Sequence, residues 1–188
     1  MREFLVFVEG ETEQLAFKRT FGFSPEIIGI ASDQIAPERI AKFVAARVIR
    51  RGGCRKLFVL FDRETRAVES SDIETTTCDV LRRELDSAGL LGEVFVSVCD
   101  RVFESWLFSD TDELSKYFKR QISDRHVFEG HNGVELLKRV IGSGKYNKTY
   151  DGPRIFERVR WSVVRKKSSS ARRSEIAGVI PDCEWLKR

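Results

Sequence analysis

Four short apolar segments, separated by longer amphipathic stretches, constrain the fold of this chain more than any other feature. Apolar runs of this length, bounded by glycine or polar residues, are typical of buried β-strands. The four segments are residues 4–8, 26–31, 56–61 and 93–98, and the stretches between them with helical patterning are 13–21, 36–51 and 71–88. This alternation predicts an α/β fold with a four-stranded parallel sheet flanked by helices.

The pattern changes after residue 98. Helical segments are predicted at 103–108, 111–118, 133–141, 153–159 and 174–180, with a basic, serine-rich tail at 162–173. We therefore expect residues 1–112 to form the α/β core. Residues 113–188 are expected to form a basic helical extension packed on that core.

The charges are divided unevenly between these two parts. Residues 1–115 contain 15 Lys and Arg against 21 Asp and Glu, a net charge of −6. Residues 116–188 contain 18 Lys and Arg against 8 Asp and Glu, a net charge of +10. An acidic half that can hold cations and a basic half that can hold phosphates fit a polyanionic substrate.

Several classes of protein are disfavoured. No apolar run approaches the ~20 residues of a membrane-spanning helix, and no charged leader precedes the first strand, so we expect a cytoplasmic protein without a membrane partner. The four cysteines form no C-x-x-C pair and are expected to be reduced thiols. The histidines, His126 and His131, are expected in a surface loop. Neither a P-loop nor a Ser-His-Asp arrangement is present.

Acidic residues follow the strands at the point where each one ends. Glu9 closes the first strand and Glu13 comes four residues later, in the first turn of the expected helix. Asp62 and Glu64 follow the third strand, and in an extended segment they would point to the same side. Because the carboxyl ends of parallel strands share one edge of the sheet, these carboxylates should converge there. Such a cluster needs a hard divalent cation, which predicts one or two Mg²⁺ or Mn²⁺ ions.

At these residues the chain resembles the Toprim (topoisomerase–primase) family. Its first motif is residues 8–13, Val-Glu-Gly-Glu-Thr-Glu, which looks like the version in the overcoming-lysogenisation-defect nucleases. Its second motif is Asp62-Arg63-Glu64, which departs from the family's D-x-D at the last position. The segment 103–110, led by Glu104, resembles a signature of small stand-alone Toprim-like proteins, and 145–153 carries a weaker resemblance.

The resemblance implies metal-dependent cleavage of phosphodiester bonds in DNA or RNA. Glu9 would be a general base or a metal ligand. The remaining ligands would be Glu13, Asp62, Glu64 and Glu104. Lys148, together with Lys145, would contact the phosphate in the transition state. The resemblance also implies a role in bacterial anti-phage defence and control by an ATPase partner.

The basic residues of the second half predict a surface for nucleic acid. Lys and Arg clusters bind phosphates and make affinity depend on salt. Besides Lys145 and Lys148, the predicted contacts are Arg160, Arg165, Lys166, Lys167, Arg172 and Arg173. A solvated basic tail, or a surface for a protein partner, is the alternative interpretation of the same residues.

Two other functions compete with the nuclease. A non-catalytic Toprim-like binding or regulatory subunit is compatible with the altered second motif, because Arg63 can partly neutralise the acids. A different metal-dependent phosphotransferase or phosphatase on a similar sheet is the third hypothesis. No particular oligomeric state is predicted.

Overall fold

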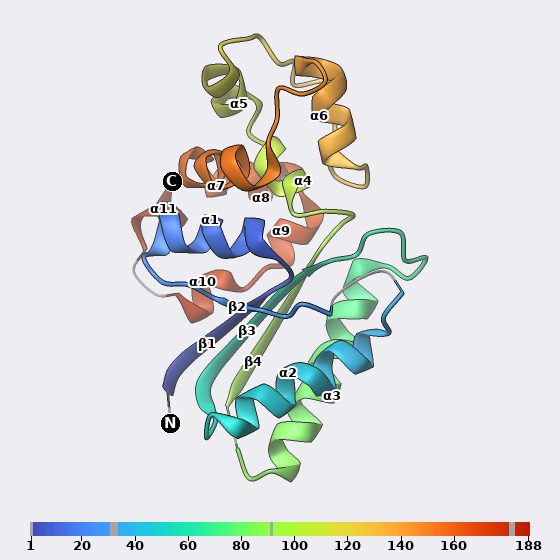
Figure 1. The fold of residues 1–188 in the computed structure, drawn as a ribbon, viewed down its shortest axis with the longest axis vertical. Coiled ribbons are helices and arrows are strands. Elements are labelled where there is room, and N and C mark those ends of the chain that lie inside the picture. Colours follow the sequence, from blue (N-terminus) through green and yellow to red (C-terminus); the bar gives the residue numbers. More distant parts are fainter. Residues whose placement is uncertain (1, 31–33, 91, 181–182) are drawn as a thin grey trace.

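The computed structural model describes residues 2–30, 34–90, 92–180 and 183–188. A four-stranded parallel sheet lies at its centre, with the strands in the order β2-β1-β3-β4. The strands are β1 (Arg2–Val8), β2 (Glu26–Ile27), β3 (Cys54–Asp62) and β4 (Glu93–Cys99). They are connected in turn by α1 (Glu11–Phe21), α2 (Pro37–Arg50) and α3 (Ser70–Ser87). The predicted α/β class, with a parallel sheet flanked by helices, is confirmed (Figure 1).

After β4 the described chain is helical, as predicted for the extension. The helices are α4 (Glu104–Phe108), α5 (Thr111–Phe118), α6 (Gly133–Ile141), α7 (Lys148–Arg158), α8 (Trp161–Lys167), α9 (Ser169–Arg173), α10 (Ile176–Val179) and α11 (Glu184–Lys187). None of the helices in the described part of the chain combines the length and the apolar character that crossing a bilayer requires. The boundary at residue 112 stays a prediction.

The two faces of the sheet are covered by different helices because side chains alternate along each strand. Leu5, Phe7 and the matching side chains of β3 pack against α2 and α3. Val6, Val8 and the alternate residues of β3 pack against α1 and the helices that follow β4. Figure 1 shows α2 and α3 together on one side and α1 with α9 and α10 on the other.

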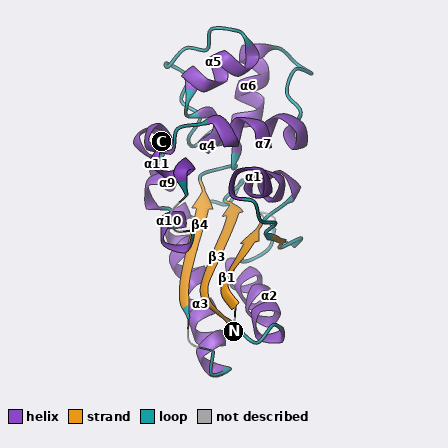
Figure 2. Cartoon of the chain, turned by 90° about the vertical axis from the view of Figure 1, so that its left-hand side faces the viewer, coloured by secondary structure: helices purple, strands orange, loops and turns teal. Residues whose placement is uncertain are grey.

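The strand register places the carboxyl ends of β1, β3 and β4 side by side. Val8 pairs with Leu60, and Asp62 pairs with Cys99. Figure 2 shows the strands pointing toward the end of the molecule where α1 and α4 lie. The residues that follow these strands therefore meet at one rim of the sheet, where open α/β folds place their sites.

The second strand is much shorter than predicted. It covers only Glu26–Ile27 and pairs with β1 alone. The N–H of Ile28 still donates to the carbonyl of Val8 at 2.8 Å, but Gly29 then has a φ of +76° and turns the chain away. The last predicted residue of this strand, Ala31, lies outside the described residues.

Helix α7 begins five residues before the predicted start at Pro153. The Oδ1 atom of Asn147 accepts a hydrogen bond from the N–H of Tyr150 at 3.0 Å and caps the helix. Pro153 therefore lies inside α7 rather than at its first position. As a result Lys148 becomes the first residue of the helix, which fixes where its side chain starts.

The serine-rich tail is folded rather than solvated. Ser168 caps α9 by accepting from the N–H of Ala171 at 3.0 Å. Ser170 is fully buried, and its Oγ accepts from Nε1 of Trp106 at 2.8 Å. All four cysteines are free thiols, as predicted.

Candidate active site

Glu9 and Asp62 meet at the carboxyl ends of β1 and β3. The backbone N–H of Asp62 donates to Oε2 of Glu9 at 2.6 Å. Asp62 is 4% exposed, and its Oδ1 is buried without a hydrogen-bond partner among the described residues. The predicted convergence of the acids that end these two strands is therefore present in the structure.

Glu13 belongs to the same cluster through the start of α1. The N–H of Gly10, the cap residue, donates to Oε2 of Glu13 at 3.1 Å, so the carboxylate folds back over the first turn. Glu13 is 3% exposed, whereas Glu11 on the same turn faces solvent. The first helical turn thus places one acid toward the strand ends and the other away from them.

Glu104 adds a carboxylate from the loop that follows β4. It begins α4 and is fully buried. Neither of its carboxylate oxygens accepts a hydrogen bond from the described residues. Its Oε1 lies 3.3 Å from Nζ of Lys148, whose side chain is 49% exposed. An ion pair thus joins α4 to the first residue of α7.

The acids raise one another's pKa values. Burial, followed by the charges of Glu13 and Glu64, raises the pKa of Glu9 to about 8, although the hydrogen bond from Asp62 opposes the shift. Burial and then the charge of Glu104 raise the pKa of Glu13. Burial and then the charge of Glu9 raise the pKa of Asp62 well above its ordinary value. These groups do not all ionise at neutral pH without a compensating positive charge.

Lys148 supplies part of that compensation. Burial lowers the pKa of its ammonium, but the charges of Glu104 and Asp62 outweigh this and raise it overall. The position of α7 depends on Gly152, because a Cβ there would lie 2.9 Å from Cγ2 of Thr12 and 3.1 Å from the hydroxyl of Tyr146. The close approach of α7 to α1 therefore brings Lys148 to the acids.

Glu64 reaches the cluster differently from the prediction. It does not continue an extended segment, because β3 ends at Asp62 and Glu64 has a φ of +53°. The expectation that Asp62 and Glu64 alternate along one strand is therefore wrong. The charge of Glu64 nevertheless contributes to the raised pKa of Glu9. Glu64 also lines a depression of about 550 Å³ on the protein surface.

The carboxylates suit a hard cation by their chemistry, although they are not arranged as a finished coordination site. No group of three or more His, Cys, Asp or Glu side chains within the described ranges has the geometry of a metal centre. Oδ1 of Asp62 and Oε2 of Glu104 are buried without a partner among the described residues, and the acids repel one another. A bound Mg²⁺ or Mn²⁺ would contact such oxygens and reduce the repulsion. The chemistry of these donors suits such an ion, whereas their present arrangement does not form a coordination site.

Tyr146 is a site residue for which the sequence predicted no role. It is 8% exposed, its hydroxyl has no hydrogen-bond partner among the described residues, and burial together with the charge of Glu104 raises its pKa. Its place two residues before Lys148 was the available signal. Arg63, in contrast, pairs with Asp100 at 2.5 Å and so holds together the loops after β3 and β4.

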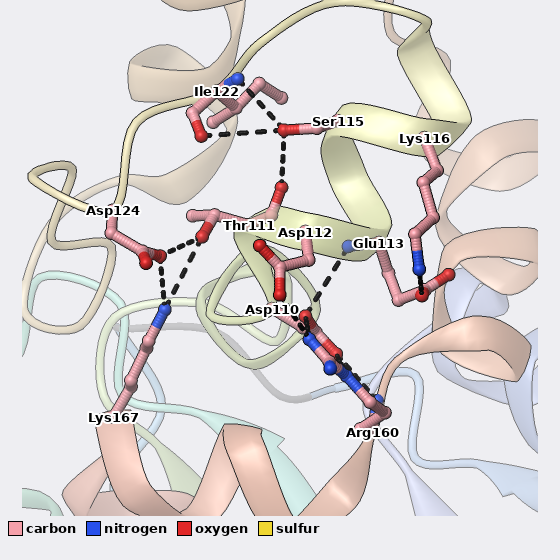
Figure 3. A network of polar contacts seen from close by, with 10 residues as sticks. All are labelled: Asp110, Thr111, Asp112, Glu113, Ser115, Lys116, Ile122, Asp124, Arg160 and Lys167. Carbon is pink, nitrogen blue, oxygen red and sulfur yellow. Dashed lines mark hydrogen bonds and ion pairs between the residues drawn. The ribbon is translucent and has the colours of Figure 1, made fainter.

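Besides Lys148, which pairs with Glu104, three of the predicted nucleic-acid contacts are engaged by acids of the protein itself. Arg160 binds both carboxylate oxygens of Asp110, which is 1% exposed in its side chain. Lys167 pairs with Asp124 at 2.6 Å, and Figure 3 shows both cations reaching the start of α5. Arg173 pairs with Glu74 at 2.9 Å. Arg160 and Arg173 thereby join the extension to the preceding residues, whereas Lys167 and Asp124 both belong to the extension.

The other predicted contacts are more open. Lys145, Arg165, Lys166 and Arg172 are exposed. Arg172 donates to the backbone carbonyls of Arg165 and Lys166 at 3.2 and 3.0 Å. Trp161 is 3% exposed and packs against Trp106 and Trp185, so its ring is not available to stack on a base. Nucleic-acid contact by the exposed cations stays a prediction.

Comparisons with protein-family models, with curated proteins and with solved structures found no match to this chain. The functional conclusions therefore depend on the geometry and chemistry of the residues themselves.

Proposed function

We propose that the protein is a Mg²⁺- or Mn²⁺-dependent nuclease that hydrolyses phosphodiester bonds of DNA or RNA. The observation that carries the proposal is the buried cluster of Glu9, Glu13, Asp62 and Glu104, in which Asp62 and Glu104 hold carboxylate oxygens without hydrogen bonds. An acidic cluster with raised pKa values at the carboxyl rim of a parallel sheet is typical of a functional site. The resemblance to Toprim nucleases supports the same assignment.

The residues can be given separate roles. Glu9, with a pKa of about 8, is suited to take a proton from an attacking water near neutral pH. Glu13, Asp62, Glu64 and Glu104 supply oxygen ligands. Lys148 is half exposed, so its ammonium can contact a phosphate oxygen while it stays near Glu104. A bound divalent cation supplies charge stabilisation for the attacked phosphate.

A cleavage assay with matched variants tests the proposal. Purified protein is incubated with plasmid, single-stranded DNA and total tRNA in the presence of Mg²⁺ or Mn²⁺. The variants Glu9→Gln and Asp62→Asn remove site carboxylates, and Glu11→Gln removes an exposed carboxylate from the same helical turn. We expect the wild type and Glu11→Gln to cleave at equal rates and the site variants to lose about 100-fold or more. Equal cleavage by all four proteins, or none by the wild type on any substrate, contradicts the proposal.

One observation favours a second candidate, a non-catalytic nucleic-acid-binding or regulatory subunit. Lys148 already pairs with Glu104 and so partly neutralises the acids. Calorimetry separates the two functions, because the nuclease must bind Mg²⁺ or Mn²⁺ and must lose this binding in Asp62→Asn, whereas a regulatory subunit need not bind either ion. The family resemblance adds a role in phage defence and control by an ATPase partner to the nuclease proposal. The cytoplasmic location expected from the sequence is also part of the proposal.

A further inference from the structure

A groove leads away from the acidic cluster along the start of α6. It consists of two depressions, of about 550 and 440 Å³, that share His131 and Asn132 in their walls. The first begins at Glu64 and includes Arg101. The second is bounded by Arg125, His126, Val127 and Arg139. We call the combined feature the α6 groove.

The α6 groove carries positive charge that the protein does not use. Arg101, Arg125 and Arg139 form no ion pair within the described residues, although the guanidinium of Arg101 donates hydrogen bonds to the backbone carbonyls of Glu64 and Gly130. The cations of the extension, in contrast, pair with acids. Arg125 and Arg139 are also exposed. The acid beside them, Glu135, pairs with Lys138 at 3.1 Å. Unpaired guanidinium groups along a groove are the groups that bind a phosphate backbone.

The groove is attached to the acidic cluster by two residues in unusual conformations. Glu64 and Arg101 have φ angles of +53° and +73°, in the left-handed region. The N–H of Glu64 donates to the carbonyl of Arg101 at 2.7 Å, and NH1 of Arg101 donates back to the carbonyl of Glu64 at 3.0 Å. Strained backbone conformations of non-glycine residues cluster at functional sites. The pair thus connects the carboxylate rim with the mouth of the groove.

We propose that the α6 groove binds the backbone of a single-stranded nucleic acid and leads it to the acidic cluster. Depressions of about 550 and 440 Å³ offer room for individual nucleotides. The imidazole rings of His126 and His131 offer surfaces on which bases can stack, and Val127, which is 60% exposed, adds an apolar contact. This inference rests on the proposed nuclease function. It places substrate binding in the α6 groove instead of on the basic tail at residues 162–173.

Binding measurements without a divalent cation test the groove separately from catalysis. The probes are fluorescently labelled oligodeoxythymidylate and oligouridylate, and fluorescence anisotropy is recorded in EDTA at several salt concentrations. The groove variant is Arg125→Gln/Arg139→Gln. The matched control, Arg39→Gln/Arg83→Gln, removes two exposed arginines from α2 and α3. A third variant, Arg165→Gln/Lys166→Gln, removes two cations of the tail.

We expect the groove variant to bind at least about five-fold more weakly, with a salt slope smaller by about 1.4, because two phosphate contacts are lost. The control should bind like the wild type. The α6 groove is excluded as the binding site if its variant binds like the wild type or if only the tail variant loses affinity. It is also excluded if all three variants lose affinity equally or if the wild type binds neither probe. Intact binding by the wild type without cleavage in Mg²⁺ or Mn²⁺ overturns the nuclease proposal but leaves the groove in place.

Discussion

The backbone N–H of Asp62 donates a 2.6 Å hydrogen bond to the carboxylate of Glu9, so the ends of two neighbouring strands are joined through one of the site's own acids. The bond fixes Glu9 beside the buried Asp62 carboxylate, although the two side chains repel each other when both are ionised. The proposed chemistry needs both carboxylates, whereas their repulsion lowers the stability of the fold. Several measurable consequences follow from that conflict.

Neutralising either acid should stabilise the protein in the absence of metal. In Glu9→Gln the amide oxygen can still accept the hydrogen bond from Asp62, while the repulsion is removed. We expect Glu9→Gln and Asp62→Asn to raise the free energy of unfolding by about 1–3 kcal/mol at about pH 8 in EDTA. Urea denaturation measures this change, and Glu11→Gln should leave it unaffected. A loss of stability in both site variants would show that the acids do not repel each other in the folded state.

Stability should also depend on pH in a defined direction. The pKa of Glu9 is about 8 in the folded protein against an ordinary value of 4.5, and those of Glu13 and Asp62 are raised as well. The folded state therefore binds protons more tightly, and its stability is lost as the pH rises through this window. In EDTA the free energy of unfolding should fall between about pH 5 and about pH 8, by about 1.4 kcal/mol per pH unit for each proton involved.

Added Mg²⁺ should counteract that loss, since the ion binds the deprotonated acids. Denaturation curves with Mg²⁺ and with EDTA should therefore differ more at about pH 8 than at about pH 5. The same series with Asp62→Asn is the control, because removing a ligand should shrink the difference. An Mg²⁺ effect that is equal at both pH values would contradict the cluster as its binding site.

Lys148→Gln should show how much the ammonium group of Lys148 stabilises the buried negative charge of Glu104. The fully buried carboxylate of Glu104 would lose its ion pair with Lys148. We expect the free energy of unfolding to fall by about 1–3 kcal/mol at about pH 8 in EDTA. This loss is smaller than for an ion pair with two buried partners, because the Lys148 side chain is 49% exposed. Lys145→Gln, at an exposed position three residues earlier, should leave stability unchanged. Equal stability of the two variants would mean that the ion pair contributes nothing to folding.

Arg160 should matter for folding rather than for binding nucleic acid. Its guanidinium holds both oxygens of Asp110, and hydrogen bonds from it keep the pKa of Asp110 below the ordinary value despite the opposing effect of burial. Arg160→Met should lower the free energy of unfolding by about 2–4 kcal/mol. Thermal and urea denaturation test this, with Arg165→Met on α8 as the control that should change stability little. Equal stability of the two variants would contradict a structural role for Arg160.

Gly152→Ala should disturb the contact between α7 and α1. The added methyl group would lie 2.9 Å from Cγ2 of Thr12, so α7 must shift. We expect a stability loss of about 1–3 kcal/mol, as for overpacked cores, together with slower cleavage because Lys148 moves with its helix. Gly144→Ala is not a suitable control, since Gly144 has a φ of +78°. The comparison variant is Ala177→Gly, which also changes one side chain by a single methyl group, at an exposed position in α10. A fully stable Gly152→Ala protein would contradict the tight packing.

The strands and helices of the first half could be predicted because their apolar patterns are regular and their ends are marked by glycines. Glu9 and Asp62 could be placed together because parallel strands share an edge. The short second strand could not be predicted, since Ile27, Ile28 and Ile30 look alike in sequence, and the pattern does not show that the chain turns away at Gly29. Pro153 suggested a helix start, whereas the side chain of Asn147 had already capped the helix.

Contacts between distant segments account for the rest of the site. Whether a lysine or arginine is available to a ligand depends on the acid that lies beside it, and the pairs of Arg160 with Asp110 and of Arg173 with Glu74 are 50 and 99 residues apart in the chain. Local patterns contain no information about such pairs. The α6 groove escaped prediction for the same reason, because Arg101 and Arg139 come from segments with no recognisable motif.

One hydrophobic cluster contains Val6, Val8, Phe58 and Leu60 from the sheet together with side chains from the helices that follow β4, including Trp185 near the C-terminus. A shortened chain that stops after β4 would leave this face of the sheet without its cover, and a wide apolar surface of that kind promotes aggregation. The C-terminal helices are therefore needed to keep the sheet, and the acids at its rim, in a folded and dispersed protein.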